Sequence, residues 1–424
     1  MSDLKAPGFP DQQVRARAKY GAAEAFPNSL RYGTTMFGEY VDGSARARDS
    51  IDRARLVPPV FVPRRMEKMI ALGREPLSDD VDLSAEVGGF RSSLPVYVSA
   101  FGSTQVANGE LGTAVSQQAG QLGIPMVIGE NIVPVSGYGR MEGEQHGSLL
   151  SRITAYTDAV PDGLGGVVVQ QSTEDADAEV WNLVYSDPAA QPLLESGRLA
   201  FELKVGQGAK PGVGGMTLVA RNRASELSAQ YDILDVYDQN TDSVLRCSSP
   251  GTFTEEILRN QIRLMRNNYP RCRVWVKLPP SRDVHHAASV AWQAGADAVT
   301  VDGAESGTGW APRSFLNHVG LPLADCLDRL DAQDNCLLVT GRIWEGARAV
   351  KCLALGASAV GLGRAALAAA DEDPEQGLVN LVNCLGLEMR LLISALGNYT
   401  VDDLSAEDIW LSEGSARSAA NTER

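Results

Sequence analysis

The chain has 424 residues, of which 44% are hydrophobic and 21% charged, a globular composition that fits one large α/β barrel and excludes a disordered or collagen-like chain. The 53 acidic residues exceed the 38 basic ones, and the resulting net charge of −15 repels polyanions. We therefore expect neither nucleic acid nor an anionic membrane surface as a partner.

The sequence carries no targeting or metal-binding pattern that we recognise. The amino-terminal stretch MSDLKAPGFPDQQVRARAKYG lacks an apolar signal region, and no uninterrupted apolar run reaches the roughly 18 residues that span a bilayer. The six cysteines form no C-x-x-C pair, and the four histidines have no partner at ligand spacing. These features predict a cytoplasmic protein without a disulfide scaffold or a metal site.

Residues 1–90 precede the first predicted strand. They include a basic run at 45–55 and the segment PPVFVPRR. We predict that they form an arm packed on the domain that follows.

Three later segments share one pattern, QLGIPMVIG at 121–129, QAGADAVTV at 293–301 and ALGASAVGL at 354–362. In each, a helix ends at a glycine and a run rich in small or β-branched apolar residues follows. This is the helix-to-strand half of a β/α unit, so the strands should form a parallel sheet.

Eight segments have the length and composition of buried strands. They are residues 95–99, 125–129, 166–170, 200–204, 273–277, 297–301, 336–340 and 359–363. Eight such strands alternating with helices predict a closed (β/α)8 barrel over residues 91–396.

A long excursion, residues 205–272, separates the fourth and fifth predicted strands. It contains a glycine-rich loop, the polar stretch YDILDVYDQNTDSV and a helix that begins at Thr254. A connection of this length at a barrel mouth is more typical of an active-site loop than of a linker. The tail, residues 397–424, is acidic and then small and polar, and we predict that its end is disordered.

Glycine-rich loops follow the last three predicted strands, at the barrel end that carries the chemistry in such folds. Gly341 and Arg342 follow the seventh strand, Gly363 and Arg364 the eighth, and the loop after the sixth is GAESGTGWAP. Backbone N–H groups in such loops bind phosphate, so three converging loops predict a phosphate site. The alternative is that each glycine only makes a turn.

Lysines end two other strands. Lys277 ends the fifth, where a cation can stabilise negative charge on the carbonyl edge of a flavin ring, although a solvated rim residue is the alternative. The fourth strand ends at Lys204 and runs into GQGAKPGVGG, which carries Gln207 and Lys210. This segment can bind a small anion, or it can be a flexible surface loop.

These segments resemble the FMN-binding domain of glutamate synthase, in its short stand-alone form, over residues 74–367. The most specific match is KVGQGAKPGVGG, against the family's K-x-x-Q-G-A-K-P-G. LPVYVSAFGS, IGEN, WVKL, SGTGWAP and VGLGRA resemble further motifs of the family. The resemblance implies a barrel that binds FMN.

Carried over position by position, the resemblance implies a cofactor site and a substrate site. The FMN ring would lie against Ala100, Phe101 and Gly102, with Gln170, Thr173 and Lys277 at its polar edge. The phosphate loops would contribute Gly307, Gly309, Gly341, Arg342, Gly363 and Arg364. Glu130, Lys204, Gln207 and Lys210 would face the substrate, which in the family is 2-oxoglutarate and its imine. Arg221 or Arg223 would add a carboxylate clamp.

The chain departs from the family pattern in four places. Only Cys384 remains where the family has the cysteine cluster that ligates an iron–sulfur centre. The run 170–175 carries acids where the family has an arginine, Ser249-Pro250-Gly251 replaces a histidine and an aspartate, and Val213 replaces a glutamate. The substrate therefore need not be 2-oxoglutarate. We find no amidotransferase domain before the barrel, so we expect ammonia, an amine or a partner chain to supply any nitrogen.

We predict an FMN-dependent oxidoreductase that acts on an amino acid or on the imine of a 2-oxo acid. An electron-donating or amine-supplying partner protein and a homo-oligomer fit this prediction. Two alternatives stay open, a redox-neutral FMN-dependent isomerase or lyase on the same barrel and a non-catalytic scaffold subunit.

Overall fold

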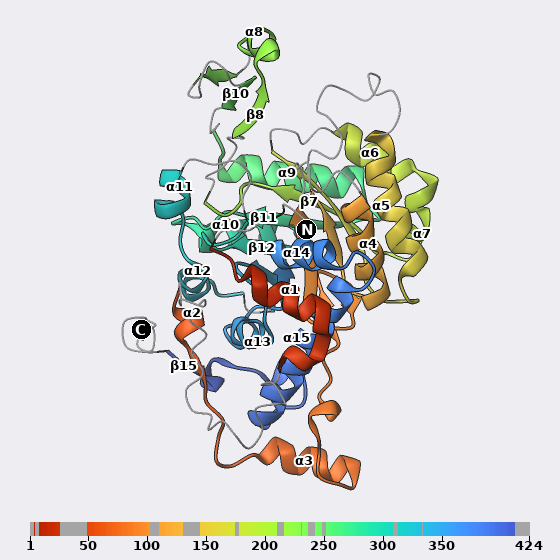
Figure 1. Ribbon diagram of the computed structural model, residues 1–424, viewed down its shortest axis with the longest axis vertical. Helices are drawn as coiled ribbons and strands as arrows, with labels where there is room; N and C mark the ends of the chain where they lie inside the picture. Colours follow the sequence, from red (N-terminus) through yellow and green to blue (C-terminus); the bar gives the residue numbers. More distant parts are fainter. Residues whose placement is uncertain are drawn as a thin grey trace.

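The computed structural model describes residues 4, 8–25, 49–101, 110–129, 145–173, 178–209, 216–229, 231–235, 242–247, 252–307, 313–332 and 334–411. Eight parallel strands close into a barrel in the order β11-β12-β13-β14-β4-β5-β6-β7 (Figure 1). They are β4 (Val96–Phe101), β5 (Met126–Ile128), β6 (Val167–Ser172), β7 (Leu199–Lys204), β11 (Arg273–Leu278), β12 (Ala298–Asp302), β13 (Leu337–Thr340) and β14 (Ala359–Leu362). The predicted (β/α)8 barrel is confirmed, each strand within two residues of its expected position.

Alternating side chains give each strand an outer and an inner face. In β12, Val299 and Val301 face outward and join the large core between strands and helices, whereas Ala298 faces inward. Both faces are buried, which explains why the strands are short, nearly continuous apolar runs in the sequence.

Helices surround the barrel (Figure 1). They are α4 (Glu110–Leu122), α5 (Gln145–Ala159), α6 (Ala178–Ser186), α7 (Gln191–Glu195), α9 (Glu255–Asn268), α10 (Val284–Ala294), α11 (Arg313–His318), α12 (Leu323–Arg329), α13 (Gly346–Ala354), α14 (Arg364–Glu372) and α15 (Gly377–Ala395). The predicted start of α9 is confirmed, because the Thr254 side chain accepts a hydrogen bond from the Ile257 N–H at 3.2 Å. Leu258, Ile262 and Met265 form its buried face at helical spacing.

A hairpin closes the amino-terminal end of the barrel. Its strands are β2 (Ala85–Val87) and β3 (Phe90–Ser92), and Val87 and Phe90 pack with Trp275 inside the barrel. The turn residue Gly88 has φ +60°, and its carbonyl accepts a hydrogen bond from the Trp275 indole N–H at 3.0 Å. Side chains therefore fill the amino-terminal end of the barrel, so a binding site is expected at the carboxyl ends of the strands.

Residues before the barrel pack along its side. The helix α1 (Asp11–Tyr20) contacts α14 and α15, and Arg17 pairs with Glu388 of α15 at 2.6 Å. The short strand β1 (Arg55–Leu56) pairs antiparallel with β15 (Ile409–Trp410), which joins the amino-terminal arm to the last described residues. The predicted disordered end of the tail, residues 412–424, lies outside the described residues.

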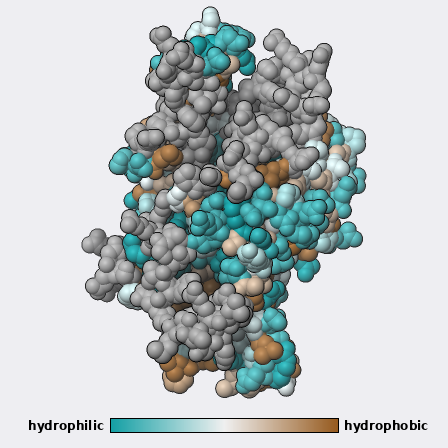
Figure 2. Space-filling model, viewed as in Figure 1, coloured by the Kyte–Doolittle hydropathy of each residue, from teal (hydrophilic) through white to brown (hydrophobic). Residues whose placement is uncertain are grey.

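Two further helices of this arm differ in what they contact. The helix α2 (Ser50–Arg53) packs on α12 and α13. The helix α3 (Pro63–Leu72) stands at the lower end of the molecule, where Figure 2 shows apolar surface. Phe61 and Ile70 are among the exposed apolar residues there, at 86% and 73% exposure.

The excursion after β7 forms a small sheet of its own above the barrel (Figure 1). Its antiparallel strands β8 (Met216–Ala220), β10 (Ser243–Cys247) and β9 (Asp232–Leu234) lie in that order. Between β8 and β9 lies the short helix α8 (Ala224–Leu227). The predicted excursion is confirmed, and its internal sheet is a feature that the sequence patterns did not indicate.

One helix in the described part of the chain, α15, is long and apolar enough to cross a membrane by length and composition alone. It lies instead against α1, α13 and α14, and its buried residues include Leu381, Leu385 and Met389. These contacts are typical of the core helix of a globular domain.

Candidate active site

The inside of the barrel changes from apolar to polar toward the carboxyl ends of the strands. At the hairpin end, Tyr97, Trp275 and Leu338 belong to a buried apolar cluster. Farther along the strands the buried inner side chains are Gln170, Glu202, Lys277, Thr300, Asp302 and Thr340, each at most 5% exposed. Buried polar groups are unfavourable unless they are paired, so this layer marks the end of the barrel that is built for binding.

Glu202 of β7 lies at the centre of one half of this layer. One of its oxygens accepts a hydrogen bond from the Gln170 side-chain amide, and the other accepts one from Thr300 Oγ1 at 3.0 Å. Burial raises the pKa of Glu202, and the charge of Lys277 opposes that rise. The pairing fixes the amide of Gln170, one of the residues predicted at the flavin edge.

Lys277 and Asp302 lie at the centre of the other half of this polar layer. The Lys277 Nζ lies 3.1 Å from Asp302 Oδ1, which also accepts a hydrogen bond from Thr340 Oγ1. The second oxygen, Oδ2, accepts the backbone N–H of Gly208 at 3.1 Å. Ser306 donates to the Thr340 carbonyl at 2.9 Å, so the loop after β12 joins the same network.

The glycine-rich segment after β7 begins inside this network. Lys204 is 9% exposed, and its Nζ donates to Gln207 Oε1 at 3.2 Å. Gly208 has φ +43°, and a Cβ there would lie 3.3 Å from the Ser306 carbonyl oxygen, so the segment sits tightly on the loop after β12. The structure thus brings the predicted substrate residues Lys204 and Gln207 to the same mouth as Lys277.

The loop after β14 leads into the amino terminus of α14. Gly363 is the N-cap of this nine-residue helix, no side-chain cap bond is present among the described residues, and a Cβ at Gly363 would meet nothing within 4 Å. The loop is therefore open at Gly363, next to the first N–H groups of α14, and a helix amino terminus is a position that binds phosphate.

Arg342, in the loop after β13, lies at the same level on the neighbouring strand, since Thr340 pairs with Gly361. Arg342 is buried, at 7% exposure, and its Nη1 donates to Asp52. Within the described residues its Nε is buried without a hydrogen-bond partner. That orphaned donor is what an incoming phosphate oxygen would satisfy.

Arg364 and Gly307 meet beside this space. A Cβ on Gly307 would lie 3.5 Å from the Arg364 side chain, whose Nη2 donates to the Glu305 carbonyl at 2.5 Å. The Arg364 guanidinium also lies over the Phe9 ring, 4.7 Å from its centroid. The loops after β12 and β14 therefore converge as predicted, with Arg364 held by the loop after β12.

Beside the loop after β13 lies a cluster of charged residues that the sequence motifs did not indicate. Arg348 of α13 pairs with Asp49 at 2.8 Å, Asp52 at 2.6 Å and Glu305 at 2.7 Å. Burial raises the pKa of Glu305 to about 7. For Asp49, burial acts in the same direction, but hydrogen bonds from Arg348 outweigh it and lower the pKa to about 2. Nothing in the separate motifs linked residues 49 and 52 to residue 348.

At the end of β4, Ala100 packs against the inner cluster of the barrel, whereas Phe101 belongs to the core between strands and helices. Ala100 and Phe101 end β4, and the Arg152 guanidinium of α5 lies 5.8 Å from the Phe101 ring centroid. Burial lowers the pKa of Arg152 to about 10. Thr173 follows β6, where its N–H donates to the Lys204 carbonyl at 3.2 Å.

Four predicted site residues lie outside the described residues. They are Gly102, Glu130, Gly309 and Lys210. Arg221 and Arg223 belong to the excursion, where Arg221 pairs with Asp235 and Arg223 lies 3.8 Å from Glu226. The carboxylate clamp expected of these two arginines stays a prediction.

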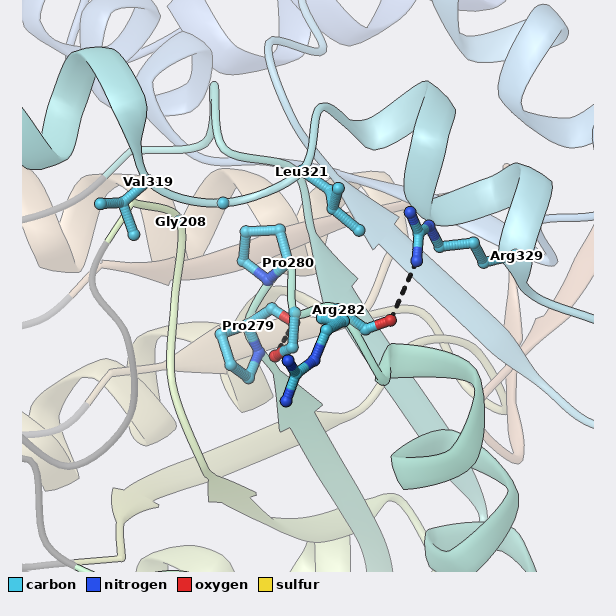
Figure 3. A pocket seen from close by; sticks show the side chains of 9 residues that line it. Gly208, Pro279, Pro280, Arg282, Val319, Leu321 and Arg329 are labelled. Carbon is cyan, nitrogen blue, oxygen red and sulfur yellow. Dashed lines mark hydrogen bonds between the residues drawn. The ribbon is translucent and has the colours of Figure 1, made fainter.

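A cavity of about 460 Å³ lies beside the mouth (Figure 3). Its lining residues are Gly208, Pro279, Pro280, Ser281, Arg282, Val319, Gly320, Leu321 and Arg329. Arg329 reaches the backbone carbonyl of Arg282 at 3.0 Å. Of these residues, Gly208 belongs to the glycine-rich segment after β7, so the cavity flanks that segment.

Solved structures share the fold of this chain. A soluble mutant of (S)-mandelate dehydrogenase from Pseudomonas putida superposes with a TM-score of 0.55 at 20% identity, over 95% of this chain and 99% of that one. A mandelate oxidase mutant with a monooxide FMN adduct gives 0.53 at 20% identity, over 85% and 88%. At this identity the likeness shows the fold alone.

Sequence comparison finds relatives among the glutamate synthases. Residues 189–371 match the conserved region in glutamate synthase. A glutamate synthase large subunit-like protein of Rhizobium meliloti is 30% identical over 278 residues, 62% of this chain and 59% of that protein. The archaeal-type glutamate synthase [NADPH] of Dehalococcoides mccartyi is 32% identical over 185 residues, 42% of this chain and 36% of that protein. The predicted resemblance to glutamate synthase is confirmed, and the chain spans only part of these relatives.

Proposed function

We propose that this chain is an FMN-dependent oxidoreductase that acts on an amino acid or on the imine of a 2-oxo acid. The observation that carries the proposal is the open amino terminus of α14 at Gly363, beside the orphaned Nε of Arg342. These donors fit one phosphate group, which is what FMN offers. The match to the conserved region in glutamate synthase supports the choice of cofactor.

The remaining described residues fit the rest of the cofactor. The phosphate would be held by Gly341, Arg342, Gly363 and Arg364, with Gly307 beside them. Gln170, Thr173 and Lys277 would bind the polar edge of the ring, and Ala100 and Phe101 its face. FMN supplies hydride transfer when bound.

The substrate would bind where the fourth strand meets the mouth. Lys204 and Gln207 are already joined by a hydrogen bond, and Lys204 is almost fully buried. A buried ammonium group favours a carboxylate partner, and a side-chain amide can orient the nitrogen of an amino acid or imine. Glu130 and Lys210 would complete this site.

The first test is the spectrum of the purified protein. We expect a yellow protein whose flavin, released by heat, runs as FMN in chromatography. A colourless protein that FMN cannot reconstitute would contradict the proposal.

The reaction class is tested by anaerobic bleaching of the bound FMN. Bleaching by an amino acid alone indicates its oxidation, whereas reoxidation of chemically reduced protein by a 2-oxo acid with ammonia indicates imine reduction. Turnover of a substrate without net electron flow would replace the proposal by a redox-neutral isomerase or lyase.

A further inference from the structure

We propose that Asp302 is a positioning residue that holds Lys277 and the Gly208 segment as one unit, so that a single carboxylate sets the cofactor edge and the substrate segment relative to each other. This inference rests on the proposed function for the roles of Lys277 and Gln207. The link between strand β11 and the glycine-rich segment depends only on the contacts of Asp302 and not on the proposed function.

Both oxygens of Asp302 are committed. Oδ1 receives the Lys277 ammonium at 3.1 Å and the Thr340 hydroxyl, while Oδ2 receives the Gly208 N–H at 3.1 Å. Asp302 is 1% exposed, so water does not compete for these bonds. Donors from three different loops or strands fix the plane of the carboxylate, and the carboxylate in turn fixes them.

The charges show why Lys277 depends on this residue. A buried ammonium needs a nearby anion. Glu202 also faces Lys277 electrostatically, but its two oxygens are bonded to Gln170 and Thr300. Among the described residues, Asp302 is the acid that forms an ion pair with Lys277.

The backbone shows why the glycine-rich segment depends on it as well. Gly208 adopts a left-handed conformation, with φ +43°, directly after Gln207, and Ala209 beyond it is buried. Because Gln207 is one peptide away from the anchored N–H, the position of its side chain follows from that anchor. The chain of contacts runs from Lys277 through Asp302 and Gly208 to Gln207, and from there to Lys204.

The test compares Asp302→Asn with Asp297→Asn as a matched control. Asp297 directly precedes the same strand at the opposite end of the barrel, where it accepts a backbone N–H from Val274 at 2.7 Å and pairs with Arg266 at 2.7 Å. Two quantities are measured in the FMN-loaded protein, the hydrogen exchange of the peptide that contains Gly208 and the midpoint potential of the flavin.

In Asp302→Asn we expect the Gly208 amide to exchange about tenfold faster, the factor that corresponds to losing a hydrogen bond to a charged acceptor. We also expect a more positive flavin potential, because a negative charge beside the Lys277 ammonium has been removed. Asp297→Asn should leave both quantities at the wild-type values. Loss of overall stability without these two changes would be a merely structural effect.

The outcomes separate the two proposals. Wild-type exchange and potential in a folded, FMN-loaded Asp302→Asn protein would overturn the role of Asp302 while the proposed function stands. A wild-type protein that binds no FMN would overturn the proposed function and the assigned roles. If Asp302→Asn does not fold, Thr340→Val removes the hydroxyl that bonds Asp302 and Ser306 and keeps the charge of Asp302. Unchanged Gly208 exchange in that variant would overturn the positioning role.

Discussion

At the scale of single residues, the backbone of Arg342 stands out. Among the described residues it is the non-glycine residue with a positive φ, +58°. A side chain in the left-handed region costs about 1–2 kcal/mol, and such strain is retained where the surroundings need the residue. Here the loop after β13 turns sharply while the Arg342 guanidinium reaches Asp52.

We predict that Arg342→Gly is about 1 kcal/mol more stable than Arg342→Ala, because both variants lose the Asp52 pair but only glycine relieves the backbone. Urea unfolding of the two FMN-free variants measures the difference. Equal stability would mean that the loop relaxes without the arginine side chain. Both variants should bind FMN more weakly than the wild type, since both lose the orphaned Nε.

Single residues also show the limit of sequence reasoning. Lys277 was expected at the inner end of the fifth strand, with a solvated rim position as the alternative, and it is buried, at 5% exposure. Asp302 is equally buried on the next strand but was not recognised, because its partners Gly208 and Thr340 become neighbours only through barrel closure. A sequence motif lies within one segment of the chain, whereas this network joins three separate segments.

At the scale of elements, the hairpin of β2 and β3 depends on one turn. At Gly88, φ is +60°, and a Cβ would lie 2.2 Å from the Trp275 ring. That ring is fully buried, and it cannot move aside without disturbing the packing at the amino-terminal end of the barrel.

We predict that Gly88→Ala lowers the free energy of unfolding by about 2–4 kcal/mol, from overpacking together with backbone strain. Gly73→Ala is the control, because Gly73 has a similar φ of +68° but nothing within 4 Å of the added Cβ. It should cost only about 1 kcal/mol. Urea unfolding of both variants gives the comparison, and equal losses would show that the Trp275 contact is not limiting.

The elements that were predicted correctly share a physical cause. The eight barrel strands are buried on both faces, so their apolar runs are visible in the sequence. The sheet of β8, β9 and β10 is different, because its strands pair with each other outside the barrel and include exposed residues such as Asp232 and Leu234. Val244, Leu245 and Cys247 of β10 are buried, but strands of three to five residues are too short to show a clear alternation in the sequence.

At the scale of the whole molecule, a buried set of charges joins the amino-terminal arm to the barrel. Asp49 and Asp52 come from the arm, Glu305 and Arg348 from the barrel. Breaking one pair in such a cluster leaves a buried charge uncompensated. The attachment of the arm should therefore respond to pH.

The raised pKa of Glu305, about 7, sets the direction of that response. The native state binds a proton there more tightly than the unfolded state, whose glutamate titrates near its usual value of about 4.3. Unfolding stability should therefore decrease as the pH rises from about 4.5 to 7, and level off above 7. The pKa of Asp49 is lowered to about 2, so Asp49 affects stability in a different pH range. Its contribution to the free energy of unfolding is lost as the pH falls from about 4 to 2.

We predict that Glu305→Gln makes the decrease between about pH 4.5 and 7 shallower, because this site no longer binds a proton differently in the two states. A smaller slope from other groups should remain, since burial also raises the pKa of Glu202 and Glu345. Urea unfolding over a pH series measures the slope. An unchanged slope would mean that Glu305 does not titrate in this range.

The closure of the barrel has a consequence for how the chain reaches this state. Strand β14 pairs with β4, so that Val360 lies beside Val96. During synthesis, the edge of β4 that pairs with β14 therefore stays unpaired until most of the chain has left the ribosome. A topology dominated by such long-range contacts folds slowly, and an open strand edge invites pairing with other chains in the meantime. The yield of active protein should thus depend on conditions that slow aggregation of nascent chains, such as low growth temperature or added chaperones.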